Sequence, residues 1–476
     1  MKVRHHWPNT ELAKIWATLL VVIVVGSSAC RKESADGSSI PAHGTPPNVI
    51  LVSIDTLRAD HMSLYGYSRS TTPFLEELAE DAIVFDQFSQ NGGGTLPSHV
   101  TMLTSLYPRT HQIFPGRDVP MPESMVTLAE HLKIHRYETG GFVDCIWLTR
   151  KFGFSQGFDH FDDQGGNIVS IGPKVFDWLH DQPASPFFLF LHVYDVHSKP
   201  DGLPYHCPEP FFSENLRFNS DSVDGCRSGL CATRFLRMVN ARLDEGKEIS
   251  DFLTPEEIKF LVELYDTGIA YIDEQMRLLI EELKSLGLYD NSLIVVTADH
   301  GENFMEHNRL LHSLGLYDTV TQVPLIIKMP EDAFGGTRVP HIASIVDIVP
   351  TILDIVGLPA LPVSQGKSLV PMFAEDLPIS DEVYIWQALR TERWKYVKTR
   401  GELFDLQDDP GERLNQASAH PDLVKAFDEK LQALETKAVA DRADLKALSM
   451  AGEGSTGLSE EEIDQLKSLG YLDGDQ

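Results

Sequence analysis

The sequence is short of positive charge. It contains 40 Lys and Arg residues against 70 Asp and Glu residues, which gives a formal net charge of −30 at pH 7. A surface of this sign repels phosphate groups, so binding to nucleic acid or to an anionic lipid surface is not expected. An anionic small molecule would need a local positive centre, which a bound metal ion or a few convergent basic side chains can provide.

Cysteine is also scarce, with five residues in 476. None belongs to a Cys-x-x-Cys pair, and this excludes the usual structural zinc site. Three of them, Cys207, Cys226 and Cys231, lie in one polar, glycine-containing segment. We expect a disulfide there, with Cys226 to Cys231 the shortest option, but the spacing does not fix the pairing and one cysteine is left over.

No apolar run is long enough to span a membrane comfortably, which takes about 20 residues. The longest, Ile15–Gly26, follows three basic residues and precedes Ser-Ser-Ala-Cys at positions 27–30. This pattern predicts a signal peptide over residues 1–30 and export to the periplasm or cell envelope. Cys30 also resembles a bacterial lipoprotein cleavage site, although Ser27 replaces the usual Leu or Val, so export with and without a lipid anchor at Cys30 both stay open.

The rest of the chain has no internal repeats and is organised as alternating strand-like and helix-like segments. A flexible linker is expected over residues 31–47, which are rich in Ser, Gly and Pro. Nearly continuous apolar runs predict buried strands at Val49–Ile54, Phe187–Tyr194, Ser292–Ala298 and Val323–Lys328. Helical periodicity marks Thr72–Ala82, Thr127–His135 and Thr254–Leu286. We therefore predict an α/β sandwich with a mostly parallel central sheet over residues 48–375.

The pattern of predicted strands and helices changes after about residue 375. Short strands are expected at Tyr384–Leu389 and Trp394–Lys398, a hairpin at residues 401–410 and a helix at Asp422–Glu435. These elements predict a smaller C-terminal α+β subdomain over residues 376–440. An acidic tail, partly helical at most, follows over residues 441–476.

Polar residues stand directly after three of the predicted strands. Asp55 follows the first, Asp195 and His197 follow the second, and Asp299 and His300 follow the third. Ligands of parallel α/β sheets bind beyond the carboxyl ends of the strands. We therefore expect these residues to lie around one site.

A glycine-rich turn, Gly92–Gly94, is followed by Thr95-Leu96-Pro97-Ser98-His99. Glycines allow a sharp turn, and Pro97 suits the first turn of a helix. Thr95 is therefore predicted to sit just before a helix N-terminus, where N–H groups and the helix dipole favour a phosphate, a sulfate or a developing oxyanion.

Four segments together resemble the sulfatase family of the alkaline phosphatase superfamily: Ser53–His61, Thr95–His99, Asp195–His197 and Thr297–Asn303. The resemblance runs from about residue 48 to residue 371 and continues through Leu389–Tyr396 and Glu402–Pro410. It implies an alkaline phosphatase or sulfatase-like fold and an enzyme that acts on an anionic ester.

The resemblance also implies a site for one divalent metal ion. Asp55, Asp299 and His300 would supply two carboxylates and an imidazole, and Thr95 Oγ a further oxygen. Family resemblance favours Ca²⁺, while these donors also suit Mn²⁺, Mg²⁺ and Zn²⁺. Thr56 stands where relatives often carry another acidic ligand.

The nucleophile position differs from the family pattern. In relatives, the nucleophile is the first residue of a Cys-x-Pro-x-Arg motif, and its cysteine is converted to formylglycine. This chain has Thr95 in place of that cysteine and His99 in place of the arginine. Threonine cannot become formylglycine, so no formylglycine is expected. A Thr95 ester would be cleaved by water, and metal coordination would activate the hydroxyl.

The segment that supplies a Lys and a His to the sulfate in relatives also has no match, since the region reads Gly140–Trp147 here. His99, Arg58, His111 and Lys151 are basic residues that could compensate, and no spacing argument selects among them. For Arg58, a structural pairing with Asp60 is favoured over a catalytic role.

His197 and His312 are the residues that the resemblance places as general acids for the leaving oxygen. The leading hypothesis is an exported, metal-dependent ester hydrolase that attacks a sulfate or phosphate ester through Thr95. The alternatives are a catalytically silent binding protein of the same fold and a phosphotransferase.

Overall fold

The computed structural model describes residues 45–117, 119–181, 186–199, 203–205, 207–215, 233–312 and 315–448. The predicted signal peptide, Cys30, Cys226 and Cys231 lie outside this part of the chain, as does most of the linker and of the acidic tail. Within it, no helix is both long and apolar enough to cross a membrane. The described residues all belong to one compact unit.

The core of the protein is an eight-stranded sheet with the order β10-β2-β9-β6-β1-β5-β3-β4. Its strands are β1 (Asn48–Ile54), β2 (Ile83–Ser89), β3 (Glu138–Phe142), β4 (His160–Asp162), β5 (Phe187–Val193), β6 (Ser292–Thr297), β9 (Leu325–Lys328) and β10 (Thr337–Ser344). All pairs are parallel except the two made by β9, which runs antiparallel to both β2 and β6. The mostly parallel sheet is the one predicted.

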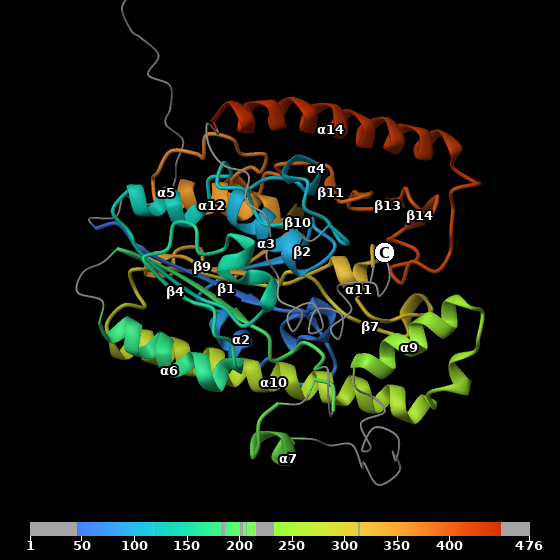
Figure 1. Ribbon diagram of the computed structural model, residues 1–476, viewed down its shortest axis with the longest axis horizontal. Coiled ribbons are helices and arrows are strands. Elements are labelled where there is room, and N and C mark those ends of the chain that lie inside the picture. The colour runs from blue at the N-terminus through green and yellow to red at the C-terminus, as the bar shows by residue number, and fades with distance from the viewer. Residues whose placement is uncertain are drawn as a thin grey trace, which may run out of the picture. The chain divides into compact units, whose positions relative to one another are not determined.

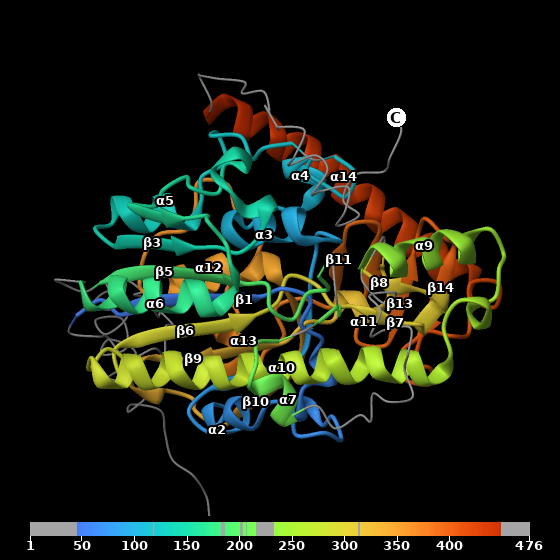
Figure 2. The same ribbon diagram turned by 60° about the horizontal axis from the view of Figure 1, so that its bottom comes forward.

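The predicted strands have the burial expected of a sheet that is covered on both faces. Every residue of β1 and of β5 is buried. This explains why their sequences are apolar at nearly every position instead of alternating. Figures 1 and 2 show α6 and α10 along one face of the sheet and α3, α5 and α12 on the other.

Two of the predicted helices begin where the sequence supplies a start signal. The helix α10 (Pro255–Ser285) has a capping box between Thr254 and Glu257 and a proline in its first turn, and α5 (Leu128–Ile134) has a capping box between Thr127 and Glu130. The other α-helices are α2 (Pro73–Leu78), α3 (Thr95–Thr104), α4 (Pro108–His111), α6 (Asn167–His180), α7 (Phe211–Asn215), α9 (Thr233–Asp244), α11 (Asp318–Thr321), α12 (Ile348–Ile355), α13 (Val370–Ala374) and α14 (Pro421–Leu448).

The C-terminal part forms a separate antiparallel sheet with the order β11-β12-β13-β14, covered by α14. Its strands are β11 (Val383–Ile385), β12 (Ala388–Arg390), β13 (Trp394–Val397) and β14 (Glu402–Asp405), and a two-stranded sheet is made by β7 (Asn303–Phe304) and β8 (Leu310–Leu311).

The predicted single strand Tyr384–Leu389 was wrong, because this segment is a hairpin in which β11 and β12 pair with each other across a two-residue turn. The helix predicted at Asp422–Glu435 is present but longer, since α14 continues to Leu448. Asp441 is held there by the Gln365 amide, whose Nε2 donates to Asp441 Oδ2 over 2.5 Å.

Candidate active site

The glycine turn leads from β2 into α3 and presents Thr95 at the first position of that helix. A side chain at Gly92 would place its Cβ 2.4 Å from the Ser98 nitrogen, so the chain can turn this tightly only with glycine there. Thr95 is 1% exposed. It was predicted to stand just before the helix, but it lies within the first turn and Gly94 is the residue that precedes α3.

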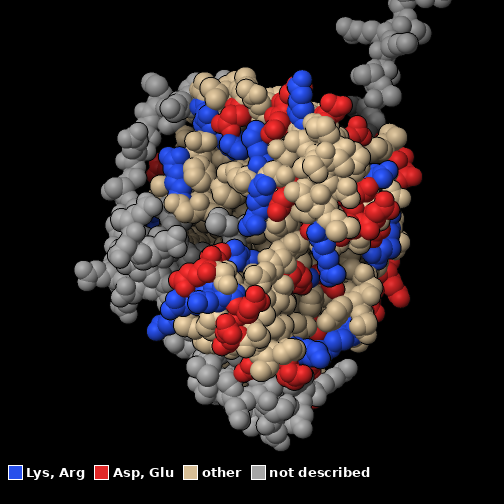
Figure 3. All heavy atoms as spheres, turned by 90° about the vertical axis from the view of Figure 1, so that its right-hand side faces the viewer, with Lys and Arg blue, Asp and Glu red and all other residues tan. Residues whose placement is uncertain are grey.

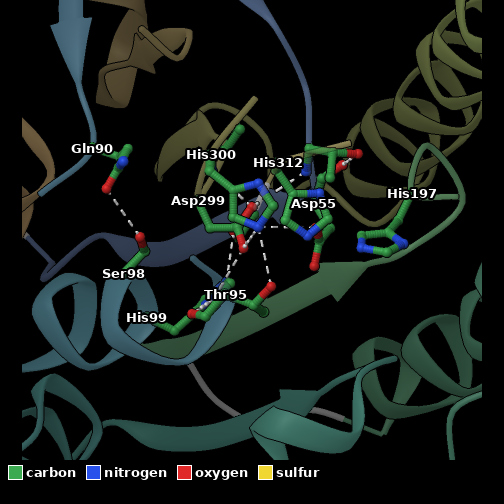
Figure 4. A network of polar contacts seen from close by, with 12 residues as sticks. Asp55, Gln90, Thr95, Ser98, His99, His197, Asp299, His300 and His312 are labelled. Carbon is green, nitrogen blue, oxygen red and sulfur yellow. Dashed lines mark hydrogen bonds and ion pairs between the residues drawn. The ribbon is translucent and has the colours of Figure 1, made fainter. Parts of the chain in front are cut away.

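Asp55 and Asp299 meet at the carboxyl ends of two neighbouring strands. The strands β1 and β6 pair in parallel, with Ser53 opposite Thr297, so the residues that follow them emerge side by side. One ligand atom from each of Asp55, Asp299 and His300 lies within 4.8 Å of the others. Thr95 Oγ1 lies 3.1 Å from His300 Nε2, which brings all four predicted metal ligands together (Figure 4).

The donor set fits a divalent cation. His300 Nε2 lies 3.7 Å from Asp55 Oδ1 and 3.4 Å from Asp299 Oδ2. Both of these carboxylate oxygens are buried and have no hydrogen-bond partner. Buried acceptors of this kind are rarely left unsatisfied, and oxygen with imidazole donors suits a hard or borderline cation.

The pKa shifts of Asp55 and Asp299 also favour a cation between the two carboxylates. Burial, with a further contribution from Asp299, raises the pKa of Asp55 well above its usual value. Burial also disfavours ionisation of Asp299, but His300 and His99 hold its pKa below the usual value. Two adjacent buried carboxylates repel each other unless a positive charge lies between them.

Two further histidines, His192 and His99, lie next to the carboxylates of Asp55 and Asp299. His192 Nε2 lies 3.3 Å from Asp55 Oδ2. His99 lies between the Ser53 hydroxyl, at 2.9 Å, and the Thr95 carbonyl, at 2.8 Å. Burial lowers the pKa of His99 to about 3 and that of His192 to about 4, so both are neutral near pH 7.

The contacts of three of the basic residues considered as replacements for the missing Lys and His show that these residues are already engaged elsewhere. His99 is neutral and engaged in holding Ser53 and the first turn of α3. His111 receives the Ile113 N–H over 3.1 Å at Nδ1, and its Nε2 lies 3.2 Å from Thr101 Oγ1 behind α3. Arg58 pairs with Asp60 over 2.6 Å, as predicted, and donates to the Glu302 carbonyl over 2.8 Å. Lys151 is exposed, and its proposed role stays a prediction.

The two predicted acids lie together beside this cluster (Figure 4). The His312 ring is 4.4 Å from the His300 ring and 5.0 Å from the His197 ring, centroid to centroid. His197 Nδ1 donates to the Ser198 carbonyl over 2.7 Å, and its Nε2 lies 3.1 Å from the Tyr194 hydroxyl. Burial, followed by the charge of His312, holds the pKa of His197 well below its usual value.

His312 is oriented by the carboxylate of Glu302, which belongs to the Thr297–Asn303 segment. Its Nδ1 lies 3.3 Å from Glu302 Oε1 and 3.4 Å from Oε2. Glu302 is fully buried. With Nδ1 turned towards Glu302, the ring directs Nε2 to the opposite side.

Three residues of the site were not predicted from the sequence: His192, Tyr194 and Glu302. A signal for the first two is present, since they alternate with Leu191 and Val193 near the end of an apolar strand. Two polar residues spaced by two in such a strand share one face of the sheet. Asp195, in contrast, has a structural contact, because its Oδ2 accepts the Ile168 N–H at the start of α6 over 2.9 Å.

The face drawn in Figure 3, which is the right-hand side of Figure 1, is hollowed, and the described part of the rim carries both acidic and basic side chains. Beside Thr95, Gly94 is half-buried, and a Cβ built on it would meet no atom of the described residues within 4 Å. The described residues therefore leave space over the backbone next to Thr95. Among the described cysteines, Cys145 and Cys207 are free thiols.

Comparisons with known proteins show which family the sequence matches. A family model described as Sulfatase matches residues 47–358, and one described as N-sulphoglucosamine sulphohydrolase, C-terminal, matches residues 308–437. Arylsulfatase K of Homo sapiens is 30% identical over 485 residues, which cover 88% of this chain and 86% of that protein.

Two solved structures share the fold. The phosphonate monoester hydrolase of Agrobacterium radiobacter has a TM-score of 0.66 at 21% identity, over 82% of this chain and 96% of that chain. A protein solved in complex with its substrate D-glucosamine-2-N,6-O-disulfate has a TM-score of 0.64 at 18% identity, over 83% and 99% of the two chains.

Proposed function

The chain belongs to the sulfatase family, and from this premise we propose that it is a metal-dependent hydrolase of sulfate or phosphate esters with Thr95 as its nucleophile. One observation carries the proposal. The Thr95 hydroxyl stands 3.1 Å from His300 Nε2, at the edge of a cluster with two unpartnered carboxylate oxygens. A hydroxyl held at such a place is the one that a cation would activate.

Asp55, Asp299, His300 and Thr95 are the residues that would hold the metal ion. When bound, a divalent cation would lower the pKa of the Thr95 hydroxyl and neutralise charge on the transferring group. Family resemblance favours Ca²⁺ for this site. His192 and His99 would keep Asp55 and the first turn of α3 in place.

Thr95 would attack the sulfur or phosphorus of the ester after its hydroxyl proton has passed to water. A bond from Thr95 Oγ1 to that atom forms, and the bond to the leaving alkoxide breaks. The alkoxide takes a proton from a neighbouring imidazole. Water then cleaves the Thr95 ester. Its oxygen bonds to the sulfur or phosphorus as the bond to Thr95 Oγ1 breaks, one of its protons returns to Thr95 Oγ1 and the other to the imidazole, and sulfate or phosphate is released.

His312 is better placed than His197 to give the proton. A general acid has to be protonated in the free enzyme, and the lowered pKa of His197 opposes this. His312 instead faces the Glu302 carboxylate, which orients its ring. We therefore assign His312 as the acid and His197 as a neutral hydrogen-bonding group near the leaving oxygen.

The replacement of the formylglycine cysteine by threonine favours phosphate over sulfate. A formylglycine hydrate expels sulfate by collapsing to the aldehyde, whereas a threonine ester has to be cleaved by water, as in threonine-nucleophile phosphatases of the same superfamily. We propose export of the protein from its N-terminal sequence, with Cys30 as the residue that a lipid anchor would use.

A substrate panel tests the function directly. The purified protein is assayed with 4-nitrophenyl sulfate, 4-nitrophenyl phosphate and a phosphonate monoester, after chelation and after addition of Ca²⁺, Mn²⁺, Mg²⁺ or Zn²⁺. We expect turnover that depends on the cation and that falls by at least about a thousandfold in Thr95→Ala. Mass spectrometry of acid-quenched protein should find the transferred group on Thr95.

The matched control is Thr104→Ala, at the other end of α3, where the hydroxyl donates to the Val100 carbonyl over 2.6 Å. This variant should retain turnover. Turnover that survives in Thr95→Ala would reject the nucleophile. If the wild type turns over none of the esters although the cation still binds, a binding protein of this fold is favoured.

A further inference from the structure

The turn that follows β1 contains a residue in an unfavourable backbone conformation. Thr56 comes directly after Asp55 and has a φ of 59°. Among the described non-glycine residues with a positive φ, it is the only one that is branched at Cβ. A β-branched residue is an outlier in this left-handed region, and such strain persists only where the surrounding structure holds it in place.

The strained conformation turns the backbone of Thr56 towards the candidate metal site. The Thr56 N–H donates to Asp299 Oδ1 over 3.3 Å, and the His300 N–H donates to the same oxygen over 2.9 Å. Asp299 Oδ2 is buried and has no hydrogen-bond partner. The two N–H groups therefore orient the carboxylate so that Oδ2 is the oxygen left for a cation.

A tyrosine on α10 holds the turn in this conformation. The Tyr265 hydroxyl donates to the Thr56 carbonyl over 2.6 Å and accepts the Arg58 N–H over 2.9 Å. The ring is fully buried and lies 4.9 Å from the Phe304 ring, centroid to centroid. One buried hydroxyl thus satisfies a carbonyl and an N–H of the turn, and both would be left without this partner in its absence.

The side chain of Thr56 is engaged within the turn itself. Its hydroxyl donates to the Asp55 carbonyl over 2.7 Å. The group that meets the Asp299 carboxylate is the backbone N–H, which every residue except proline has. The conformation of the backbone at position 56, and not the type of side chain, therefore decides whether this donor reaches Asp299.

We propose that Tyr265 is a positioning residue for the metal site: its hydroxyl holds Thr56 in the left-handed conformation in which the Thr56 N–H orients Asp299. The inference rests on the proposed function, because it concerns the cation of that site, and it adds a residue from outside the ligand set. Without the hydroxyl, Thr56 relaxes to a negative φ and its N–H turns away from Asp299. Only the fraction of molecules with the turn in place then binds the cation with full affinity, so the apparent affinity falls.

Calorimetric titration of the chelated full-length protein measures this effect without any turnover. The probe is Ca²⁺, or whichever of Mn²⁺, Mg²⁺ and Zn²⁺ the wild type binds more tightly. Tyr265→Phe removes the hydroxyl and keeps the buried ring, and we expect its affinity for the cation to fall about tenfold. The matched control is Tyr271→Phe on the same helix, where the buried ring lies 5.3 Å from the Phe211 ring, and it should bind like the wild type.

A second substitution separates this positioning role from general packing. Glycine adopts a positive φ without strain, so Thr56→Gly keeps the N–H donor and no longer depends on the Tyr265 hydroxyl. Thr56→Gly alone should bind the cation within about threefold of the wild type. In that background, Tyr265→Phe should weaken binding by less than about threefold instead of tenfold. A purely structural Tyr265 would cost the same factor in both backgrounds.

Three results would overturn the inference while the proposed function stands. The first is equal affinity of Tyr265→Phe and the wild type, and the second is the same loss in the Thr56 and Gly backgrounds. The third is a fall of tenfold or more in Thr56→Gly alone, which is measurable even if Tyr265→Phe does not fold. If the wild type itself binds none of the cations, the metal-dependent function and the inference both fail, so the wild-type titration distinguishes the two failures.

Discussion

Gly92 and Gly94 flank one turn but differ in what a side chain would meet. A Cβ at Gly92 would lie 2.4 Å from the Ser98 nitrogen and 2.8 Å from the Ser98 Cα, both of which are backbone atoms that cannot move away. A Cβ at Gly94 would meet no atom of the described residues within 4 Å, and the φ of Gly94, 166°, is extended backbone that any residue adopts.

We therefore predict that Gly92→Ala lowers the free energy of unfolding by about 1–3 kcal/mol, as overpacking does in a core. Gly94→Ala should stay close to the wild type. Urea denaturation of the two variants checks this difference. An equal loss in both would contradict the assigned contact.

At the scale of elements, α2 is capped by a residue from another helix. Thr72 precedes α2 but makes no side-chain capping bond. The Phe74 and Leu75 N–H groups instead donate to the two carboxylate oxygens of Asp273 on α10, over 2.8 Å and 2.9 Å. Burial outweighs these two bonds and raises the pKa of Asp273 to about 7.

This raised pKa predicts a pH dependence of stability. The folded protein binds the Asp273 proton more tightly than the unfolded chain, whose Asp pKa is about 3.9. The stabilisation is complete below about pH 4 and is lost as the pH rises through about 7. The wild type should therefore lose stability relative to Asp273→Asn between pH 5 and pH 8.

Urea denaturation at both pH values measures that change. The exposed Glu281→Gln on the same helix serves as the control and should show no such trend. A difference between wild type and Asp273→Asn that is constant with pH would show that Asp273 does not titrate in this range.

At the scale of the whole molecule, a buried ion cluster joins the small sheet to the active-site loop. Lys395 on β13 is fully buried, and its Nζ lies 2.7 Å from Asp318 Oδ1 and 2.9 Å from Glu412 Oε1. Asp318 begins α11, and the Thr319 carbonyl in that helix accepts the Glu302 N–H over 3.1 Å. The cluster therefore connects β13 to the loop that carries His300 and Glu302.

Lys395→Met should lower the free energy of unfolding by about 3–5 kcal/mol, because it leaves the buried Glu412 and the half-buried Asp318 without their ammonium partner. The matched control is Lys398→Met, which removes an exposed pair with Asp428 at 2.8 Å and should cost about 1 kcal/mol or less. Chemical denaturation of both variants measures the difference. A small, equal effect would show that the buried cluster does not hold the two parts together.

The sequence by itself determined the buried strands and the order of the polar residues that follow them. The strands β1, β5 and β6 are apolar at nearly every position because both of their faces are covered, and this property can be read locally. Parallel strands then bring their carboxyl ends to one edge, which is why Asp55 and Asp299 could be placed together in advance.

Only the tertiary structure decided the direction of β9 and the partners of His192 and Glu302. An apolar run does not encode which way a strand runs, because side chains alternate identically in both directions. The contacts of His192 with Asp55 and of His312 with Glu302 depend on how segments that are separated along the chain pack together. Such contacts arise from register and packing, which no local pattern of residues specifies.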